Sequence, residues 1–201
     1  MLSENLKKNY IDDLIKKQSE QKEWVRQHDR YVKSISRIFA ESMAFSHSDI
    51  TDFELAGEFH DIGKIYISDS LLNKSERLTE EEFDLIKNHV LYGYLIFKNN
   101  KELVHLSDII LYHHERFDGK GYVCGLKSEE IPLMARMLSI VDSYEAMTGN
   151  RPYSKPLSVD RAVNELIIQK EKQFDPDMVD IFIDKVIPSW GSKKGNYPDP
   201  F

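Results

Sequence analysis

The stretch WVRQHDRYVKSISRIF, residues 24–39, decides the fold class. Its apolar residues recur at steps of three and four, which places them on one face of a long helix. His28 lies on that same face. A single imidazole on an apolar helix face is more often a hydrogen-bonded core residue than a metal ligand, so His28 alone predicts no site.

The same period recurs along the chain and predicts about seven helices. After residues 24–39, apolar residues with helical spacing run from residue 49 or 51 into 59–64, and through 80–97, 102–115, 132–148, 158–170 and 177–187. Thr79 with Glu82 forms a capping box, and Asp175 before Pro176 is a typical helix start. KIYIS, residues 64–68, is the only short strand candidate. The sequence therefore predicts an all-α bundle.

One domain with two short extensions is expected from the 201 residues. The domain is predicted at 21–188. Residues 1–20 form a weaker amphipathic helix or extension, which could pack on the bundle, pair with a second chain or stay mobile. Residues 189–201 are predicted to be an irregular C-terminal tail.

Charge and composition exclude several classes of function. A net charge of −7 argues against binding to a nucleic-acid polymer, which needs a basic face. No apolar run reaches the length of a membrane span, and the charged start does not look like a signal peptide. The single cysteine, Cys124, suits a reducing compartment, so we expect a cytoplasmic protein.

Histidine and aspartate residues recur about once per predicted helix. Asp142 is the hardest to explain as a structural residue, because an unpaired carboxylate inside an apolar run is costly. Imidazole mixed with carboxylate suits manganese, iron, nickel or zinc. Seven candidates are too many for one tetrahedral zinc and about right for a metal pair that shares a carboxylate. The candidate ligands are His28, His60, Asp61, His89, His113, His114 and Asp142.

Five motifs give the chain a family resemblance. They are FHDIGK (59–64), NHVLYG (88–93), YHHERFDGKGY (112–122), IPLMARMLSIVDSYEAMT (131–148) and NRPY (150–153). In these motifs the sequence resembles the HD-GYP branch of the HD-domain metal-dependent phosphohydrolases, from about residue 28 to residue 182. The resemblance implies an HD-domain helical bundle that hydrolyses cyclic di-GMP or a related cyclic dinucleotide with two or three metal ions.

The resemblance also implies roles for individual residues. It implies the seven metal ligands given above, with Asp61 as the bridging carboxylate. His60, Asp61 and Lys64 would form the catalytic group, in which a metal-bridging hydroxide attacks the phosphate and Lys64 stabilises the charge. A solvated Lys64 just past a helix end is the alternative. The expected substrate-binding residues are Arg151, Lys120, Tyr122, Asp118 and Arg116; Tyr122 could instead pack on the protein.

Four departures from the family pattern refine these expectations. Val123 replaces the proline of the GYP triplet, Glu145 replaces an aspartate, and Ser154 replaces a basic residue. Trp24 stands where members with three metals have a glutamate, which favours two divalent ions, iron or manganese ahead of nickel or zinc. The expected partners are the cyclic dinucleotide and either a second copy of the chain or a sensory or GGDEF protein. Another nucleotide substrate, or a weakly active metal- or nucleotide-binding sensor, is the alternative function.

Overall fold

The computed structural model describes residues 2–74, 76–151 and 155–194. These residues form helices and contain no β-strand, so the predicted all-α class is confirmed. The α-helices are α1 (Leu2–Ser19), α2 (Glu23–Ser42), α3 (His47–Phe59), α4 (Asp69–Leu72), α5 (Glu80–Lys87), α6 (His89–Lys98), α7 (Ser107–Tyr112), α8 (Leu133–Thr148), α9 (Val159–Ile168), α10 (Pro176–Ile181) and α11 (Ile187–Lys194). Shorter turns are the 3-10 helices η1 (Ile62–Tyr66), η2 (Val104–Leu106) and η3 (Ser128–Glu130) and the π-helix η4 (Phe182–Val186).

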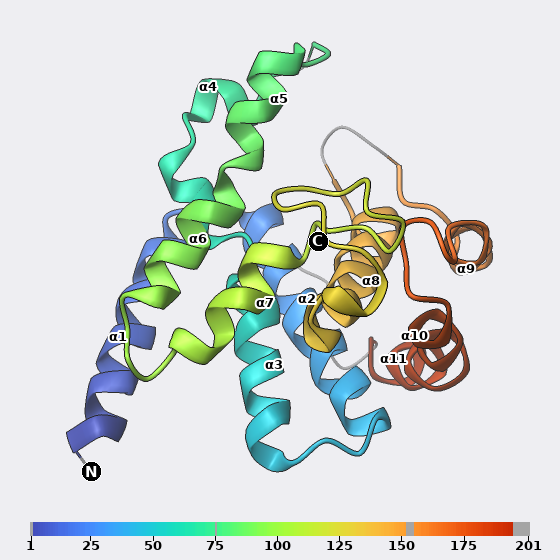
Figure 1. The fold of residues 1–201 in the computed structure, drawn as a ribbon, viewed down its shortest axis with the longest axis horizontal. Coiled ribbons are helices and arrows are strands. Elements are labelled where there is room, and N and C mark those ends of the chain that lie inside the picture. The colour runs from blue at the N-terminus through green and yellow to red at the C-terminus, as the bar shows by residue number, and fades with distance from the viewer. Residues whose placement is uncertain (1, 75, 152–154, 195–201) are drawn as a thin grey trace.

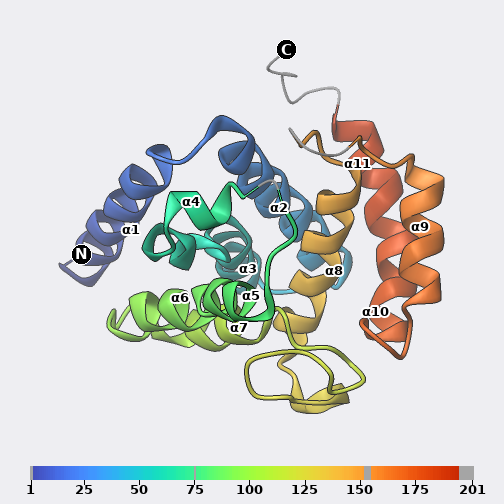
Figure 2. The same ribbon diagram turned by 90° about the horizontal axis from the view of Figure 1, so that it is seen from above.

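Helix α2 lies at the centre of the bundle, as its apolar stripe predicts. It packs against α3, α8 and η4, and Val32, Ile35 and Phe39 are almost fully buried in these contacts. Helices α9, α10 and α11 lie on one side of α8, whereas α1 and α6 lie on the far side of α3 (Figures 1 and 2). Helices α4 and α5 extend from one end of the bundle and bury no residue (Figure 1).

Three sequence-based boundaries are wrong, and side-chain chemistry explains two of them. The helix expected at 80–97 breaks at Asn88 into α5 and α6, and the helix expected at 102–115 ends at His113. At both breaks, Nδ1 of a histidine donates a hydrogen bond to a carbonyl in the last turn of the preceding helix. Carbonyls in the last turn have no amide of their own helix to pair with, so the histidine supplies the missing donor. The strand candidate at 64–68 begins instead in η1.

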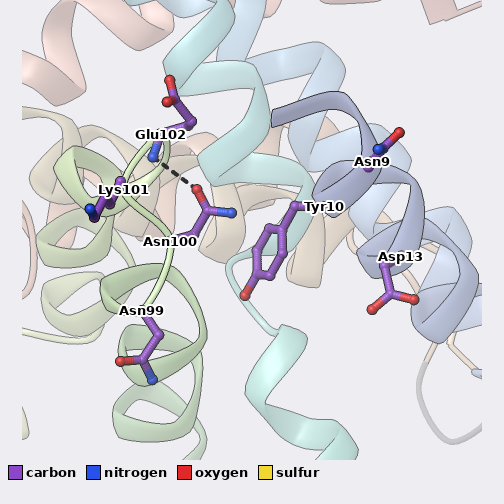
Figure 3. Close-up of a pocket in the computed structure, with 7 residues that line it drawn as sticks. All are labelled: Asn9, Tyr10, Asp13, Asn99, Asn100, Lys101 and Glu102. Atoms are coloured by element: carbon purple, nitrogen blue, oxygen red, sulfur yellow. Dashed lines mark hydrogen bonds between the residues drawn. The ribbon is translucent and has the colours of Figure 1, made fainter. Parts of the chain in front are cut away.

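Helix α1 packs on the bundle, the first of the three alternatives for residues 1–20. Leu14 is 1% exposed within the hydrophobic core, and the hydroxyl of Tyr10 donates a 2.6 Å hydrogen bond to the carbonyl of Ile96 on α6. An open pocket of about 560 Å³ lies beside Tyr10, between α1 and residues 99–102 (Figure 3). Its lining contains no predicted ligand.

The predicted tail is partly helical. Helix α11 continues to Lys194, and Trp190 is buried in the core, so residues 189–194 are not irregular as expected. Residues 195–201 lie outside the described part of the chain. Within the described residues, no helix has both the length and the hydrophobicity that crossing a bilayer requires.

Candidate metal centre

The seven predicted ligands come from five helices and gather in one place. His28 lies on α2 and Asp142 on α8, while the other five stand at or beside helix ends. His60 caps α3 and precedes Asp61, His89 begins α6, and His113 and His114 directly follow α7. Five of the seven are buried, and His114 and Asp142 are half-buried.

One half of the cluster joins α2, the end of α3 and α8. The Nε2 atoms of His28 and His60 lie 3.4 Å apart. Oδ1 of Asp142 lies 3.3 Å from Nε2 of His28 and 3.7 Å from Nε2 of His60. These three atoms therefore surround a space of the size that one ion needs.

Asp61 connects this half to a second one. Its Oδ2 lies 3.5 Å from Nε2 of His60, and its Oδ1 lies 3.2 Å from Nε2 of His89. Asp61, His89, His113 and His114 each offer a potential ligand atom, and these atoms all lie within 4.8 Å of one another. The two oxygens of Asp61 thus face different halves of the cluster, as a bridging carboxylate must.

The imidazole rings are oriented through their other nitrogen. Nδ1 of His60, His89 and His113 donates to the carbonyl three residues earlier in the chain, at 2.9, 2.8 and 2.7 Å respectively. Nδ1 of His28 donates to the carboxylate of Glu145. Because these contacts direct Nδ1 to an acceptor, each Nε2 faces the cluster, which is the usual orientation of histidine ligands.

The side chains fit divalent transition metals. Oδ1 of Asp61 and Nε2 of His89 and His113 are buried, and none of them has a hydrogen-bond partner among the described residues. Leaving a buried polar atom unsatisfied costs about 1–3 kcal/mol, so three such atoms facing one space fit a cation-binding site. Imidazole nitrogen with carboxylate oxygen is a donor set typical of manganese, iron, nickel or zinc.

The protonation states of several ligands already suit a cation. Burial alone would raise the pKa of Asp61, but the charges of Lys64 and His60 hold it well below its usual range. Burial lowers the pKa of His114 to about 3 despite Asp142. Burial, with help from neighbouring imidazoles, also lowers the pKa of His113 well below its usual value. These groups are therefore ready to donate lone pairs at neutral pH.

His28 and His60 differ from the other rings. Burial opposes their protonation, yet Asp142 and Glu145 raise the pKa of His28 to about 10, and Asp61 and Asp142 raise the pKa of His60. Without a metal, the neighbouring carboxylates therefore favour protonation of these two rings. A bound cation would replace those protons.

Gly63 allows the two halves to approach. A Cβ on Gly63 would lie 2.0 Å from the carbonyl oxygen of His89 and 2.6 Å from the amide nitrogen of Gly93. Only glycine leaves room for η1 against α6 at this point. The glycine of the HDIGK motif thus brings Asp61 next to His89.

A pocket of about 600 Å³ opens onto the cluster. His28, Asp61, His114 and Asp142 lie in its wall, and so do the two predicted cations Lys64 and Arg151. Nζ of Lys64 forms an ion pair with Asp61, so Lys64 is not merely a solvated residue past a helix end. The rest of the wall includes these apolar side chains: Trp24, Val25, Ile65, Ile67, Leu72, Ile86 and Ala146.

The other predicted substrate residues lie on the loop of residues 116–125, outside the lining of this pocket. Arg116 pairs with Asp118 at 3.0 Å and reaches Gln173, and Lys120 is exposed. The Tyr122 ring lies 5.0 Å from the His114 ring, so it packs on the protein in this structure. Of the RPY motif, Pro152 and Tyr153, with Ser154 after them, lie outside the described residues.

The sequence interpretation missed two buried acids near the ligands. Asp29 is 3% exposed and directly follows His28. Glu115 is 2% exposed, and its carboxylate accepts from the backbone amides of Cys124 at 2.6 Å and Gly125 at 3.0 Å. Their only signal in the sequence is that each immediately follows a predicted ligand, which does not distinguish a buried acid from an exposed one.

Comparison with known proteins agrees with this geometry. An HD domain family model matches residues 12–178. The chain is 38% identical over 158 residues to a cyclic di-GMP phosphodiesterase of Thermotoga maritima, covering 78% of this chain and 43% of that protein. It is 31% identical over 156 residues to 3'3'-cGAMP-specific phosphodiesterase 2 of Vibrio cholerae, covering 77% of this chain and 29% of that protein.

A solved structure shares the fold. It is the HD domain of the Listeria monocytogenes phosphodiesterase PgpH in complex with cyclic-di-AMP, with a TM-score of 0.64 at 20% identity, covering 94% of this chain and 99% of that one. The chain spans less than half the length of the two curated relatives. The resemblance drawn from the motifs is confirmed, and the chain belongs to the HD domain family.

Proposed function

We propose that this protein is a metal-dependent phosphodiesterase that hydrolyses a cyclic dinucleotide, with cyclic di-GMP as the first candidate. The observation that carries the proposal is Asp61, whose two oxygens face two clusters of ligand-type side chains 3.5 and 3.2 Å away. The name of the Thermotoga maritima relative supports the choice of substrate.

Two divalent ions, iron or manganese, would be held by the residues of the cluster. His28, His60 and Asp142 would hold one, His89, His113 and His114 the other, and Asp61 would join them. When bound, such ions supply Lewis acidity, which lowers the pKa of water and neutralises charge on a phosphodiester.

Two side chains of the pocket would act on the substrate. Lys64, next to Asp61, would stabilise negative charge on the phosphoryl or leaving oxygen, as a compact cation does. Arg151 would bind a phosphate or a guanine edge, since its planar fork fits both. Both cations line the pocket, where Asp61 and Asp142 also lie in the wall, so a phosphate that enters would meet two cationic side chains beside the candidate ligands.

A second candidate substrate is 3'3'-cyclic GMP-AMP. The Vibrio cholerae relative named for that substrate covers 77% of this chain, nearly the same share as the Thermotoga maritima relative. Both substrates present a phosphodiester between purine nucleosides, so the same metal centre would serve either. The preference for guanine or adenine would then depend on the side chains in the pocket wall.

The experiment is purification without oxygen, elemental analysis of the metal content, and assay against a panel of cyclic dinucleotides. We expect metal-dependent hydrolysis that His60→Ala and Asp61→Asn both abolish. A fully metal-loaded protein that hydrolyses no member of the panel would overturn the proposal and favour the sensor. Cytoplasmic location, and a second copy or a sensory or GGDEF protein as partner, complete the proposal and are tested by fractionation and co-purification.

A further inference from the structure

Helix α1 presents three residues on one face toward the bundle. Tyr10, Leu14 and Gln18 are four residues apart, which stacks them on the same side of a helix. Leu14 is 1% exposed in the core and Gln18 is 8% exposed. Burial of a glutamine is unusual unless its amide is hydrogen-bonded, so its partners show what it does.

The amide of Gln18 joins α1 to the two helices that carry His28 and His60. Its Nε2 donates to Oδ2 of Asp29 on α2 at 2.8 Å and to the carbonyl of Glu58 on α3 at 2.7 Å. Asp29 directly follows His28, and Glu58 lies two residues before His60. One side chain therefore holds together two ligand-bearing helices.

One carboxylate oxygen of Asp29 has no hydrogen-bond partner among the described residues. Its side chain is buried, and among the hydrogen bonds of the described residues it accepts one, from Gln18 to Oδ2. Oδ1 is buried with no partner. Asp29, His28 and His60 each offer a potential ligand atom, and these atoms lie within 4.8 Å of one another. A buried carboxylate with one neutral donor is costly unless a cation is near.

We propose that Asp29 is a further acidic residue of the metal centre, on its His28 and His60 side, and that Gln18 positions Asp29 from α1. The proposal rests on the metal centre of the proposed function, and it does not depend on the identity of the substrate. Because Gln18 belongs to α1, metal binding and the docking of α1 are linked. Linkage is reciprocal, so metal binding stabilises the docked helix as much as the docked helix favours metal binding.

The test measures metal affinity in the full chain by competition with a chelator, using manganese as the probe. Asp29→Asn removes the charge with little change in shape, and Gln18→Met removes the amide. Tyr10→Phe is the matched control, because it removes a different hydrogen bond between α1 and the bundle, beside the pocket of Figure 3. We expect D29N to weaken manganese binding about 10- to 100-fold and Q18M by less, with Y10F unchanged.

A purely structural role for the Gln18–Asp29 pair gives a different result. It predicts that D29N lowers the melting temperature equally with and without manganese and leaves the affinity unchanged, and that outcome overturns the proposal. Our proposal predicts that D29N binds manganese more weakly than the wild type, and that the rise in its melting temperature on adding manganese is smaller.

Hydrogen exchange of the α1 amides gives the second readout. Manganese should slow exchange in α1 in the wild type and in Y10F, and should do so much less in Q18M. If D29N does not fold, Q18M decides the matter by the same two measurements. If the wild type binds manganese through Asp29 but hydrolyses no cyclic dinucleotide, the proposed function is wrong and this inference still holds. If the wild type binds no manganese, this inference is wrong.

Discussion

Glu145 accepts a hydrogen bond from Nδ1 of His28, while Nε2 of the same ring faces Asp142 at 3.3 Å. Two carboxylates one helical turn apart on α8 therefore hold opposite sides of one imidazole. The family resemblance implies an aspartate at position 145, and the longer glutamate reaches the ring. Glu145 thus fixes which nitrogen of His28 is free to bind a metal.

Glu145→Ala should weaken metal binding about 10- to 100-fold, because the ring of His28 loses its orientation and basicity. Glu145→Gln, which keeps a hydrogen-bond acceptor, should lose less. The measurement is metal affinity by chelator competition, with Glu129→Ala on the exposed turn η3 as the control. Equal affinities for E145A and E129A would contradict this role.

Asp61→Asn and Asp142→Asn should differ in how much metal they lose. Asp61 faces both halves of the cluster, whereas the contacts of Asp142 are with His28 and His60. We expect D61N to lose metal from both halves and D142N to keep about half of the wild-type content, as measured by elemental analysis. Loss of all metal in D142N would contradict this expectation and would indicate that the two halves of the cluster bind metal together.

Lys64→Met should lower kcat by a factor of about 10² while the metal content is unchanged, since the lysine is proposed to stabilise charge that develops during the reaction. Lys64→Arg keeps the charge and should recover part of the rate. The measurement is steady-state kinetics on the cyclic dinucleotide together with metal analysis of the same sample. A raised KM with unchanged kcat would assign Lys64 to substrate binding alone.

Gly63→Ala should unfold the protein or displace His89, because its Cβ would lie 2.0 Å from a backbone oxygen that cannot move independently. Gly191→Ala is the matched control, since the Cβ it would add has no atom of the described residues within 4 Å apart from its chain neighbours and its own helix backbone. In helix α11 that change should stabilise the protein by about 0.5–1 kcal/mol. Thermal melting of the two variants checks both statements.

Where the local pattern and the tertiary contacts agree, the sequence was sufficient to predict the element. The stripe from Val32 to Phe39 predicted α2, and the apolar run around Asp142 predicted α8 with a carboxylate facing inward. The breaks at Asn88 and His113 were not predictable, because the apolar pattern continues through them. They depend on imidazoles that turn back to a carbonyl and that face Asp61 from other helices.

Tertiary contacts also explain why the burial of Asp29 and the pairing of Arg116 were not predicted from the sequence. Asp29 is buried because α1 covers it, and the weak periodicity of residues 1–20 did not predict that contact. Arg116 was assigned to substrate, but its nearest acid is Asp118, two residues away on the same loop. The guanidinium of Arg116 therefore forms an ion pair within its own loop and does not line the pocket.

Glu115, the residue after His113 and His114, accepts hydrogen bonds from the backbone amides of Cys124 and Gly125 and so anchors the loop of residues 116–125. A displacement of the loop at residues 124 and 125 would break those two hydrogen bonds. Cys124 is exposed and is the only thiol in the sequence, so a maleimide fluorophore would attach at one site without further mutagenesis. Its emission would then report in real time whether a nucleotide lifts the loop or enters beneath it.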